Sequence, residues 1–238
     1  MAPIENKLIA NLPRSSRLSL MKVCEPVQLT LADILAEGGK PISHVYFPAE
    51  SFISMITLLD GKPVLEVGMV GREGMLGAQL ALGLNTEPLH AIVQGGGSAW
   101  RTTALALRRE LAGNQPLKAT LYRYLHVTAT QLAGSAACLR FHQIRPRLAR
   151  WLLMTQDRAN SSSFRVTHEF LALMLGVRRV GITNAAAALQ RQGLVEYHRG
   201  DVNVLSRRGL EKASCSCYAS DRRIYDQVMS SVDTKSAN

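Results

Sequence analysis

Short apolar runs alternate with turn residues along the first part of the chain, from Val27 to about Leu107. The runs VQLTL, HVYF, SFISMITLL and VLEVGMV are rich in strand-favouring residues, and Gly, Pro and Asp separate them. The segment SFISMITLLDGKPVLEVGMV has the pattern of a hairpin that turns at Asp60 and Gly61. AIVQ and AWRTTA, on either side of GGGS, continue the pattern. We therefore predict an antiparallel β-roll, similar to a jelly roll, over residues 1–112.

The apolar spacing becomes helical beyond this region. Asn114 can cap a helix whose first turn contains Pro116, and apolar residues then recur every three or four positions as far as Ala136. This pattern predicts a long helix over residues 113–140 with one apolar stripe, which small residues widen. Two interpretations stay open: the stripe packs onto the roll, or it pairs with the same helix of a second subunit. Pro146 opens a further helix, and RANSSSF is expected to be a polar loop.

The segment from residue 166 to residue 209 has the most specific pattern in the chain. Thr167 can cap a short helix that ends at Gly176, where glycine permits a tight turn into a second helix. After Gly193 the period becomes two, in LVEY and VNVL, with HRGD at the tip of a hairpin. Two short helices followed by a hairpin predict a winged helix-turn-helix. The inner faces of the two helices are expected to contain Phe170, Leu171, Met174 and Leu175, then Ile182, Ala185, Ala186 and Leu189.

The positive charge of the chain is concentrated in one part of the sequence. A chain of 238 residues is long enough for two domains, and its formal net charge is +10. Residues 140–223 contain 15 of the 28 Lys and Arg and 6 of the 18 Asp and Glu, a balance of +9, which leaves +1 for the rest. Such a block favours a polyanionic partner over a basic surface that only maintains solubility. The predicted fold is α+β, with a winged helix-turn-helix domain over residues 141–223.

Polar side chains gather at the beginning of the second short helix. A helix that enters the major groove presents its first turns to the base edges, where Arg can bind guanine and Asn can bind adenine. The wing suits contact with phosphates beside the groove. We assign base reading to Arg178, Arg179, Val180, Thr183 and Asn184, and phosphate contact to Thr167, Arg191, His198 and Arg199.

These residues resemble the winged helix-turn-helix of the Crp/Fnr superfamily of bacterial transcription regulators, especially from Thr167 to Tyr218, which includes ASCSCY. The resemblance implies a β-roll sensor, a dimerisation helix and a DNA-binding domain in this order. It also implies a homodimer on double-stranded DNA, with RNA polymerase and an unidentified small-molecule effector as further partners. In the family, a basic, an acidic and a later basic residue contact the bases, whereas the matching positions here are Arg179, Val180 and Asn184. The familiar half-site is therefore not expected.

The glycine-rich segment VLEVGMVGREGMLG matches the place where cyclic-nucleotide-binding members hold their ligand. Those members have Gly-Glu-Leu-Gly, whose glutamate binds the ribose, and an arginine about ten residues later that neutralises the phosphate. Here methionine replaces the glutamate, and TEPLHAIVQ contains no arginine. We therefore predict that the glycines serve the fold and that the effector pocket is degenerate. Its residues are Arg72, Glu73, Gly74, Met75, Leu76, Gly77, Leu89 and His90.

The remaining sequence features argue against several classes of function. The chain has no GxSxG, HExxH, P-loop or dinucleotide motif, so we expect no enzyme and no catalytic residue. No cofactor and no metal are expected, because His44, His90, His126 and His142 are scattered and Cys215 and Cys217 lack a matching pair. The four cysteines are interpreted as thiols, and Cys215 and Cys217 as buried or inert ones with a redox role as the alternative. Without an apolar span or signal peptide, we expect a cytoplasmic protein without a membrane partner. The alternative function is a signalling protein whose roll binds a non-nucleotide ligand.

Overall fold

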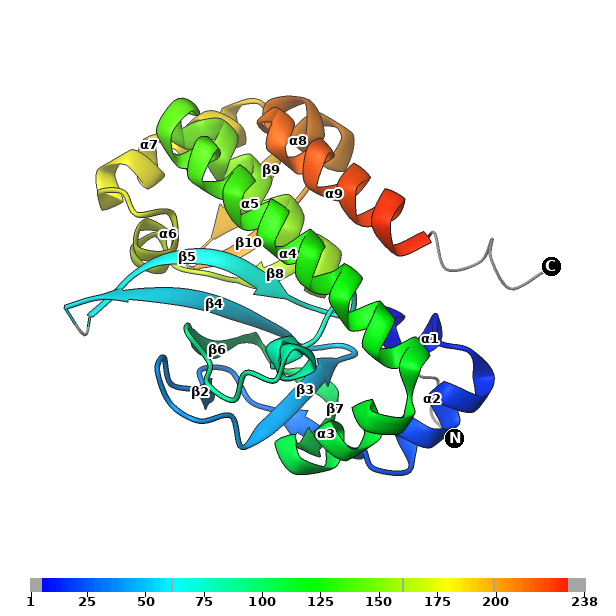
Figure 1. Cartoon of the computed structure of the whole chain (residues 1–238). Helices are drawn as coiled ribbons and strands as arrows, with labels where there is room; N and C mark the ends of the chain where they lie inside the picture. The colour runs from blue at the N-terminus through cyan, green and yellow to red at the C-terminus, as the bar shows by residue number, and fades with distance from the viewer. Residues whose placement is uncertain (1–5, 61, 160, 199, 231–238) are drawn as a thin grey trace. The chain divides into compact units, whose positions relative to one another are not determined.

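The computed structural model describes residues 6–60, 62–159, 161–198 and 200–230 (Figure 1). The chain divides into two compact units, which we describe separately. One consists of Met1–Met55, Met69–Thr130 and Arg223–Asn238, and the other of Ile56–Gly68 and Gln131–Arg222. Helices and antiparallel strands are both present, so the α+β prediction is confirmed.

Two sheets form the predicted roll, with strand orders β1-β7-β3 and β2-β6-β4-β5. Their strands are β1 (Glu25–Leu29), β2 (Ile34–Ala36), β3 (His44–Pro48), β4 (Phe52–Leu59), β5 (Lys62–Val70), β6 (His90–Gly95) and β7 (Gly97–Thr103). β7 pairs antiparallel with both β1 and β3, and β2 pairs antiparallel with β6. The predicted β4–β5 hairpin is present, and Asp60 at its turn has a positive φ. Gly61 lies outside the described residues.

Helices flank the roll and supply part of its core. They are α1 (Lys7–Ala10), α2 (Arg14–Met21), the 3₁₀ helix η1 (Ala78–Leu82) and α3 (Ala104–Gly113). Phe47 of β3, Leu107 of α3 and Met75 are almost completely buried in one hydrophobic cluster. The helices α1, α2 and α3 were not predicted from the sequence pattern. Burial of apolar side chains against the roll stabilises such short helices more than their own propensity does.

The long helix α4 (Gln115–Phe141) begins where the sequence predicts. The Asn114 side chain accepts a hydrogen bond from the Leu117 backbone N–H at 3.2 Å. The N-terminal part of α4 buries Leu117 and Leu121 in the core of the first unit. Its later apolar residues are less covered: Tyr122, Leu132 and Leu139 are 43%, 37% and 37% exposed. Part of the predicted stripe therefore packs onto the roll, and part of it faces outward.

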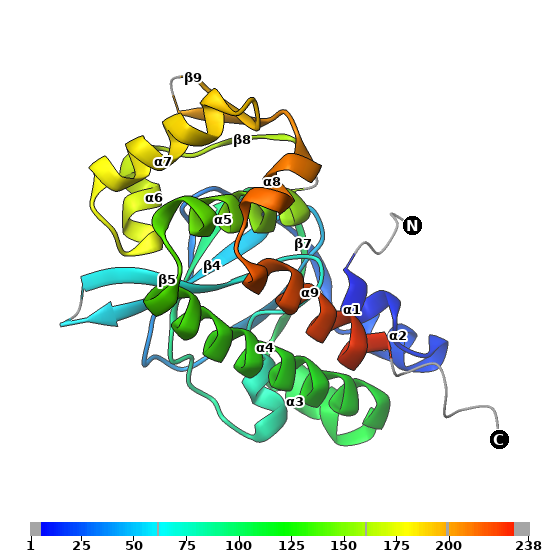
Figure 2. The ribbon, with the colours of Figure 1, turned by 90° about the horizontal axis from the view of Figure 1, so that it is seen from above.

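The second unit contains the predicted helix-turn-helix and wing (Figure 2). Besides the end of α4 and the parts of β4 and β5 within Ile56–Gly68, its elements are α5 (Ile144–Ala159), β8 (Ser163–Arg165), α6 (His168–Leu175), α7 (Arg179–Arg191), β9 (Val195–His198), β10 (Asp201–Val204), α8 (Arg207–Ala213) and the start of α9 (Ser216–Met229). β10 pairs antiparallel with β8 and β9, in the order β8-β10-β9.

Two local expectations in this unit are corrected. The helix assigned to start at Pro146 starts at Ile144, and the polar loop RANSSSF contains the end of α5 and the first two residues of β8. β8 was missed because Phe164 is its only apolar residue. Phe164 pairs with Val202 of β10, which lies far away in the sequence. Among the described helices, none is alone long and apolar enough to span a membrane. Only α6 and α7 together reach that length and composition, with a bend of 109° between them.

Candidate nucleic-acid interface

The turn between α6 and α7 is built by two local devices. The Thr167 hydroxyl accepts a hydrogen bond from the Phe170 N–H at 3.1 Å and so caps α6, as predicted. Gly176 ends α6 with φ 61°, a left-handed conformation that glycine adopts without strain. The Arg147 guanidinium donates to the Leu175 carbonyl at this end of α6. The resulting 109° bend lies within the range of helix-turn-helix motifs.

A buried layer holds α7 in place. Ile182 and Leu189 on its inner face are completely buried, as is Leu171 of α6. Both helices pack against α5, whose Leu148 and Leu152 are also completely buried. The inner face predicted from the sequence is thereby confirmed for α7, and for α6 except that Phe170 is only partly buried. Because the inner face is fixed, the rotation of α7 about its axis is fixed as well.

The outer face of α7 presents the residues assigned to base reading. All five are exposed, and Val180 is 63% exposed although it is apolar. The six residue steps from Arg178 to Asn184 span about 9 Å along a helix. This length corresponds to about three base steps of about 3.4 Å each. The structure thus places the assigned residues together at one end of α7: Arg178, Arg179, Val180, Thr183 and Asn184.

Thr183, one of the residues assigned to base reading, already has hydrogen-bond partners, and one of them, His168, was not predicted from the sequence. The Thr183 hydroxyl donates to the Arg179 carbonyl at 3.2 Å, and it lies 3.2 Å from Nδ1 of His168. The His168 ring stands edge-on to Tyr197 of the wing, with centroids 5.1 Å apart. Burial, and then the charge of Arg179, lower the pKa of His168 below its usual value of 6.5. His168 therefore connects α6, α7 and the wing as a neutral ring, which only the tertiary structure reveals.

The wing lies beside the start of α6. The Val166 N–H donates to the Gly200 carbonyl at 2.7 Å, and Gly200 turns the hairpin with φ 91°. Of the residues assigned to phosphate contact, Thr167, Arg191 and His198 are exposed. Arg199 lies outside the described residues.

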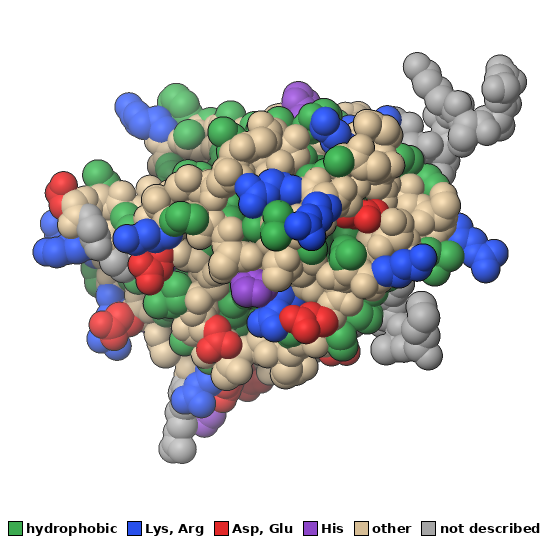
Figure 3. All heavy atoms as spheres, turned by 60° about the horizontal axis from the view of Figure 1, so that its bottom comes forward, with side chains coloured by type: hydrophobic (Ala, Val, Ile, Leu, Met, Phe, Trp, Pro, Cys, Tyr) green, Lys and Arg blue, Asp and Glu red, His purple; other side chains and the backbone are tan. Residues whose placement is uncertain are grey.

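The positive charges of this unit divide into two groups. Arg150 forms a largely buried ion pair with Asp221 at 2.7 Å, and Arg207 pairs with Asp157 at 2.7 Å and Glu211 at 3.1 Å. Within the described residues, by contrast, Arg178, Arg179 and Arg191 form no ion pair. The basic block identified in the sequence thus contains arginines that form ion pairs within the unit as well as arginines that face outward. Figure 3 shows a different face of the molecule, on which positive and negative side chains are mixed.

In the roll, the residues assigned to a degenerate pocket are mostly structural. Met75, at the position of the family's glutamate, is 2% exposed and belongs to the hydrophobic core. A Cβ atom at Gly74 would lie 2.1 Å from the Tyr124 hydroxyl oxygen, and Gly77 has φ 92°. Both glycines therefore permit close packing or a left-handed turn. Gly74, Met75, Leu76 and Gly77 are buried, and Arg72, Glu73, Leu89 and His90 are partly exposed.

Specific contacts fix the polar members of this group. A Glu73 carboxylate oxygen accepts a hydrogen bond from the Gly71 N–H at 3.2 Å. His90 Nδ1 lies 3.4 Å from the Gly38 N–H. Nearby, Glu87 is buried and accepts hydrogen bonds from Gln79 at 2.6 Å and the Leu89 N–H at 3.3 Å, while burial raises its pKa. Glu87 is not predicted as a site residue from the sequence, because one carboxylate in a polar segment gives no signal of burial.

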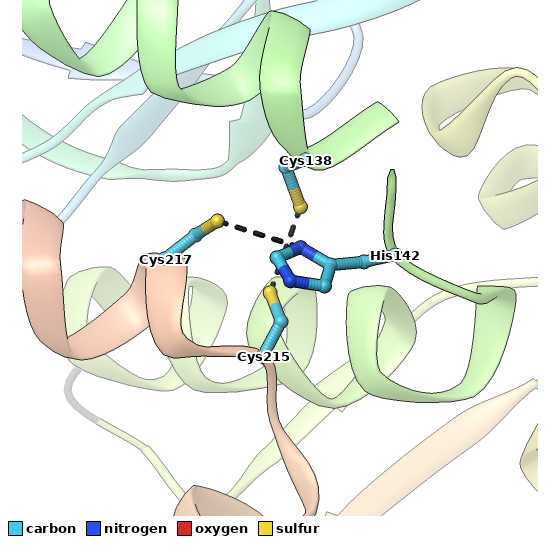
Figure 4. Close-up of side chains that lie close together, drawn as sticks. All are labelled: Cys138, His142, Cys215 and Cys217. Atoms are coloured by element: carbon cyan, nitrogen blue, oxygen red, sulfur yellow. Dashed lines mark hydrogen bonds between the residues drawn. The ribbon is translucent and has the colours of Figure 1, made fainter. Parts of the chain in front are cut away.

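Three cysteines and one histidine of the second unit converge, although the sequence suggested only scattered histidines and a Cys215 and Cys217 pair without a match. Cys138 lies near the end of α4, His142 just after it, Cys215 before α9, and Cys217 in its first turn. Their ligand atoms all lie within 4.8 Å of one another (Figure 4). Segments 73 residues apart supply these side chains, from His142 to Cys215, so sequence spacing could not reveal the cluster.

Comparisons with known proteins agree with this geometry. The protein-family model of the Crp-like helix-turn-helix domain matches residues 146–213 of this chain. No curated protein matches the chain. FixK2 from Bradyrhizobium japonicum has a similar structure, with a TM-score of 0.66 and 15% identity over 81% of this chain and 98% of its own. TTHB099 from Thermus thermophilus, a CRP-family transcriptional regulator, has a TM-score of 0.62 and 19% identity over 79% of this chain and 96% of its own.

A third similar structure is that of CLP from Xanthomonas campestris, described as a c-di-GMP-responsive global regulator. Its TM-score is 0.59, with 17% identity over 82% of this chain and 100% of its own. These structures share the fold along most of their length. The resemblance to Crp/Fnr regulators inferred from the sequence is confirmed, in the helix-turn-helix domain by its family and in the rest of the chain by its fold.

Proposed function

Because residues 146–213 form a Crp-like helix-turn-helix domain in a chain with the Crp/Fnr fold, we propose that this protein is a homodimeric, sequence-specific DNA-binding transcription regulator. The observation that supports it most is the outer face of α7. Arginine and asparagine side chains stand exposed there and form no ion pair among the described residues, on a helix whose inner face is buried. These side chains are therefore already in place on a folded helix and need no further folding to contact DNA.

The chemistry of this face suits base edges in the major groove. Arg179 has the donors for guanine O6 and N7, and Asn184 has the donor and acceptor for adenine. Exposed Val180 replaces the acidic residue found in relatives and can contact a thymine methyl group instead. The half-site of this protein therefore differs from that of regulators with an acidic residue at this position.

Phosphate contacts complete the proposed interface. Arg191 at the end of α7 and His198 in the wing are exposed, as is Thr167 at the start of α6. Arg199, next to His198, is included from the sequence alone. These groups orient the domain on the duplex without choosing its sequence.

The exposed stripe of α4 supports dimerisation. Tyr122, Ala129 and Ala136 are seven residues apart, and Leu125, Leu132 and Leu139 follow each of them by three. This is the a and d spacing of a two-stranded coiled coil, and all of these residues except partly buried Leu125 are exposed. We propose that α4 pairs with its copy in a second subunit. Two recognition helices would then read two half-sites related by two-fold symmetry.

The roll has no usual cyclic-nucleotide site in this proposal. Met75 points into the core, and no positive side chain replaces the missing arginine at Leu89 and His90. An effector, if one acts on the roll, is therefore of another class than cyclic AMP. The protein regulates through DNA and RNA polymerase and not through catalysis, and it works in the cytoplasm with the chromosome.

Selection of bound fragments from a genomic library tests the proposal. The full chain should enrich a small set of duplexes that share a two-fold symmetric sequence, and its affinity should fall steeply as salt rises. A control chain with Arg178→Ala and Arg179→Ala should keep its fold and lose the enrichment. Equal binding to all duplexes, with or without these arginines, would contradict sequence-specific recognition.

A further inference from the structure

Cys138, His142, Cys215 and Cys217 converge outside the set of residues assigned to DNA contact. The Cys138 and Cys215 sulfurs lie 3.5 Å apart, and the Cys217 sulfur lies 3.6 Å from His142 Nδ1. Figure 4 shows the three sulfur atoms and the imidazole directed toward one small volume. Cys138 and Cys215 are only 2% and 6% exposed, while Cys217 and His142 are partly exposed.

These separations match the edges of a tetrahedron around one metal ion. Zinc binds sulfur at about 2.3 Å and imidazole nitrogen at about 2.0–2.1 Å. In a regular tetrahedron these radii place two sulfurs about 3.8 Å apart and a sulfur and a nitrogen about 3.5 Å apart. The observed 3.5 and 3.6 Å differ from these edges by a few tenths of an ångström at most. The remaining pairs, all within 4.8 Å, need their separations to shorten by about 1.3 Å or less to complete the shell.

We propose that Cys138, His142, Cys215 and Cys217 bind one Zn²⁺ ion in a structural site. Three thiolates and one imidazole are a ligand set that zinc takes in closed, four-coordinate sites. Because all four positions of the tetrahedron come from the protein, none is left for a substrate. The proposal is independent of the function proposed above.

Other uses of the cluster explain less of the geometry. A disulfide between Cys138 and Cys215 would leave the positions of Cys217 and His142 without a role, and all four cysteines of the chain are free. In an iron–sulfur cluster the protein ligands are divided among two or more iron atoms, so ligands of different iron atoms lie farther apart than ligands of a single ion. Ligand atoms gathered within 4.8 Å fit one ion better.

The surroundings favour a site with excess negative charge. Three thiolates around Zn²⁺ carry a net charge of −1, and buried charge needs compensation. Arg147 and Arg150, one turn apart on α5, act electrostatically on Cys138 and Cys215. Cys215 and Cys217 lie at the start of α9, where the helix dipole also favours negative charge.

The ion would join three segments of the second unit. Cys138 belongs to the end of α4, His142 to the α4–α5 connection, and Cys215 and Cys217 to the α8–α9 connection. The Arg150–Asp221 pair and the Gln131 contact with the Asp221 carbonyl, at 3.4 Å, already link α4, α5 and α9 beside the site. Zinc would therefore fix the end of α4 to the last part of the DNA-binding unit.

Metal content of the full chain decides the proposal. We expect about one zinc per chain by elemental analysis after purification with reduced thiols and no added chelator. Replacement by Co²⁺ should give the thiolate-to-cobalt and d–d absorption bands of a tetrahedral sulfur-rich site. Cys217→Ser and His142→Gln, at the two partly exposed ligands, should weaken metal binding by at least about tenfold. Metal removal should lower the melting temperature of the native chain.

Matched controls separate this site from adventitious binding. Cys24→Ser removes the cysteine of the first unit, and His126→Gln changes an exposed histidine of α4. Both should keep one zinc per chain and the cobalt spectrum. A native chain with reduced thiols that binds no zinc and gives no thiolate–cobalt band would overturn the proposal, even if every ligand variant failed to fold. Iron with acid-labile sulfide, or a Cys138–Cys215 disulfide in reducing medium, would overturn it too.

Discussion

Arg179→Ala tests whether the outer face of α7 reads bases. Arg179 is exposed at the first position of α7 and forms no ion pair within the described residues. Its removal should therefore change the free energy of unfolding by no more than about 0.5 kcal/mol, as for most surface substitutions. A loss of DNA-binding free energy larger than this value is then caused by a lost contact with DNA and not by a change in the fold.

The expected loss depends on what Arg179 contacts. A bidentate contact with guanine contributes about 1–3 kcal/mol, so affinity for the preferred duplex should fall about 5- to 150-fold. Affinity for unrelated duplexes should fall much less, and preference should relax at one base pair of each half-site. A phosphate contact would instead weaken all duplexes alike and reduce the salt slope by about one.

Fluorescence anisotropy with preferred and scrambled duplexes, at several salt concentrations, distinguishes these outcomes. Arg109→Ala is the matched control, because it removes the same charge from an exposed position of α3 in the other unit. It should leave the ratio of specific to nonspecific affinity unchanged. If Arg179→Ala and Arg109→Ala behave alike on both duplexes, the assignment of α7 as the reading helix is wrong.

Three further predictions concern packing, assembly and pH. Gly74→Ala should cost about 1–3 kcal/mol in denaturant unfolding, because its Cβ would lie 2.1 Å from the Tyr124 hydroxyl oxygen, and Tyr124→Phe should recover part of this. Leu132→Glu should convert dimers to monomers in light scattering, because it places a charge in the proposed α4 seam. His168 should titrate below pH 6.5 by NMR, and its pKa should rise in Arg179→Ala yet stay lowered, because burial is the larger cause. Since the unfolded chain binds this proton more readily, His168 should reduce stability as pH falls below about 6.5.

Each of these has a contrary outcome. Unchanged stability of Gly74→Ala would show that the space beside Tyr124 is open. Ala119→Glu adds the same charge to an exposed position of α4 off the heptad stripe, so equal loss of dimers in this control would reject the seam. A His168 pKa at or above 6.5 in the native chain would contradict its burial.

The sequence by itself determined the elements whose signals are local. Asn114 and Thr167 cap their helices through their own side chains, and Gly176 must stop α6 because it alone accommodates the left-handed turn. The inner face of α7 follows from its spacing, since burial on a helix repeats every three to four residues. The face predicted for DNA recognition is therefore exposed as expected.

Tertiary structure decided what depends on residues far apart in the chain. β8 has too few apolar residues to signal a strand and forms because β10 offers it a partner. His168 reaches Thr183 and Tyr197 only after α6, α7 and the wing pack together. The Cys138, His142, Cys215 and Cys217 cluster has no regular spacing, because two segments far apart in the sequence supply it. Helix caps and turns can be predicted from neighbouring residues, because their hydrogen bonds and backbone angles are local. The distant partners of a side chain are determined only by the packing of the whole unit.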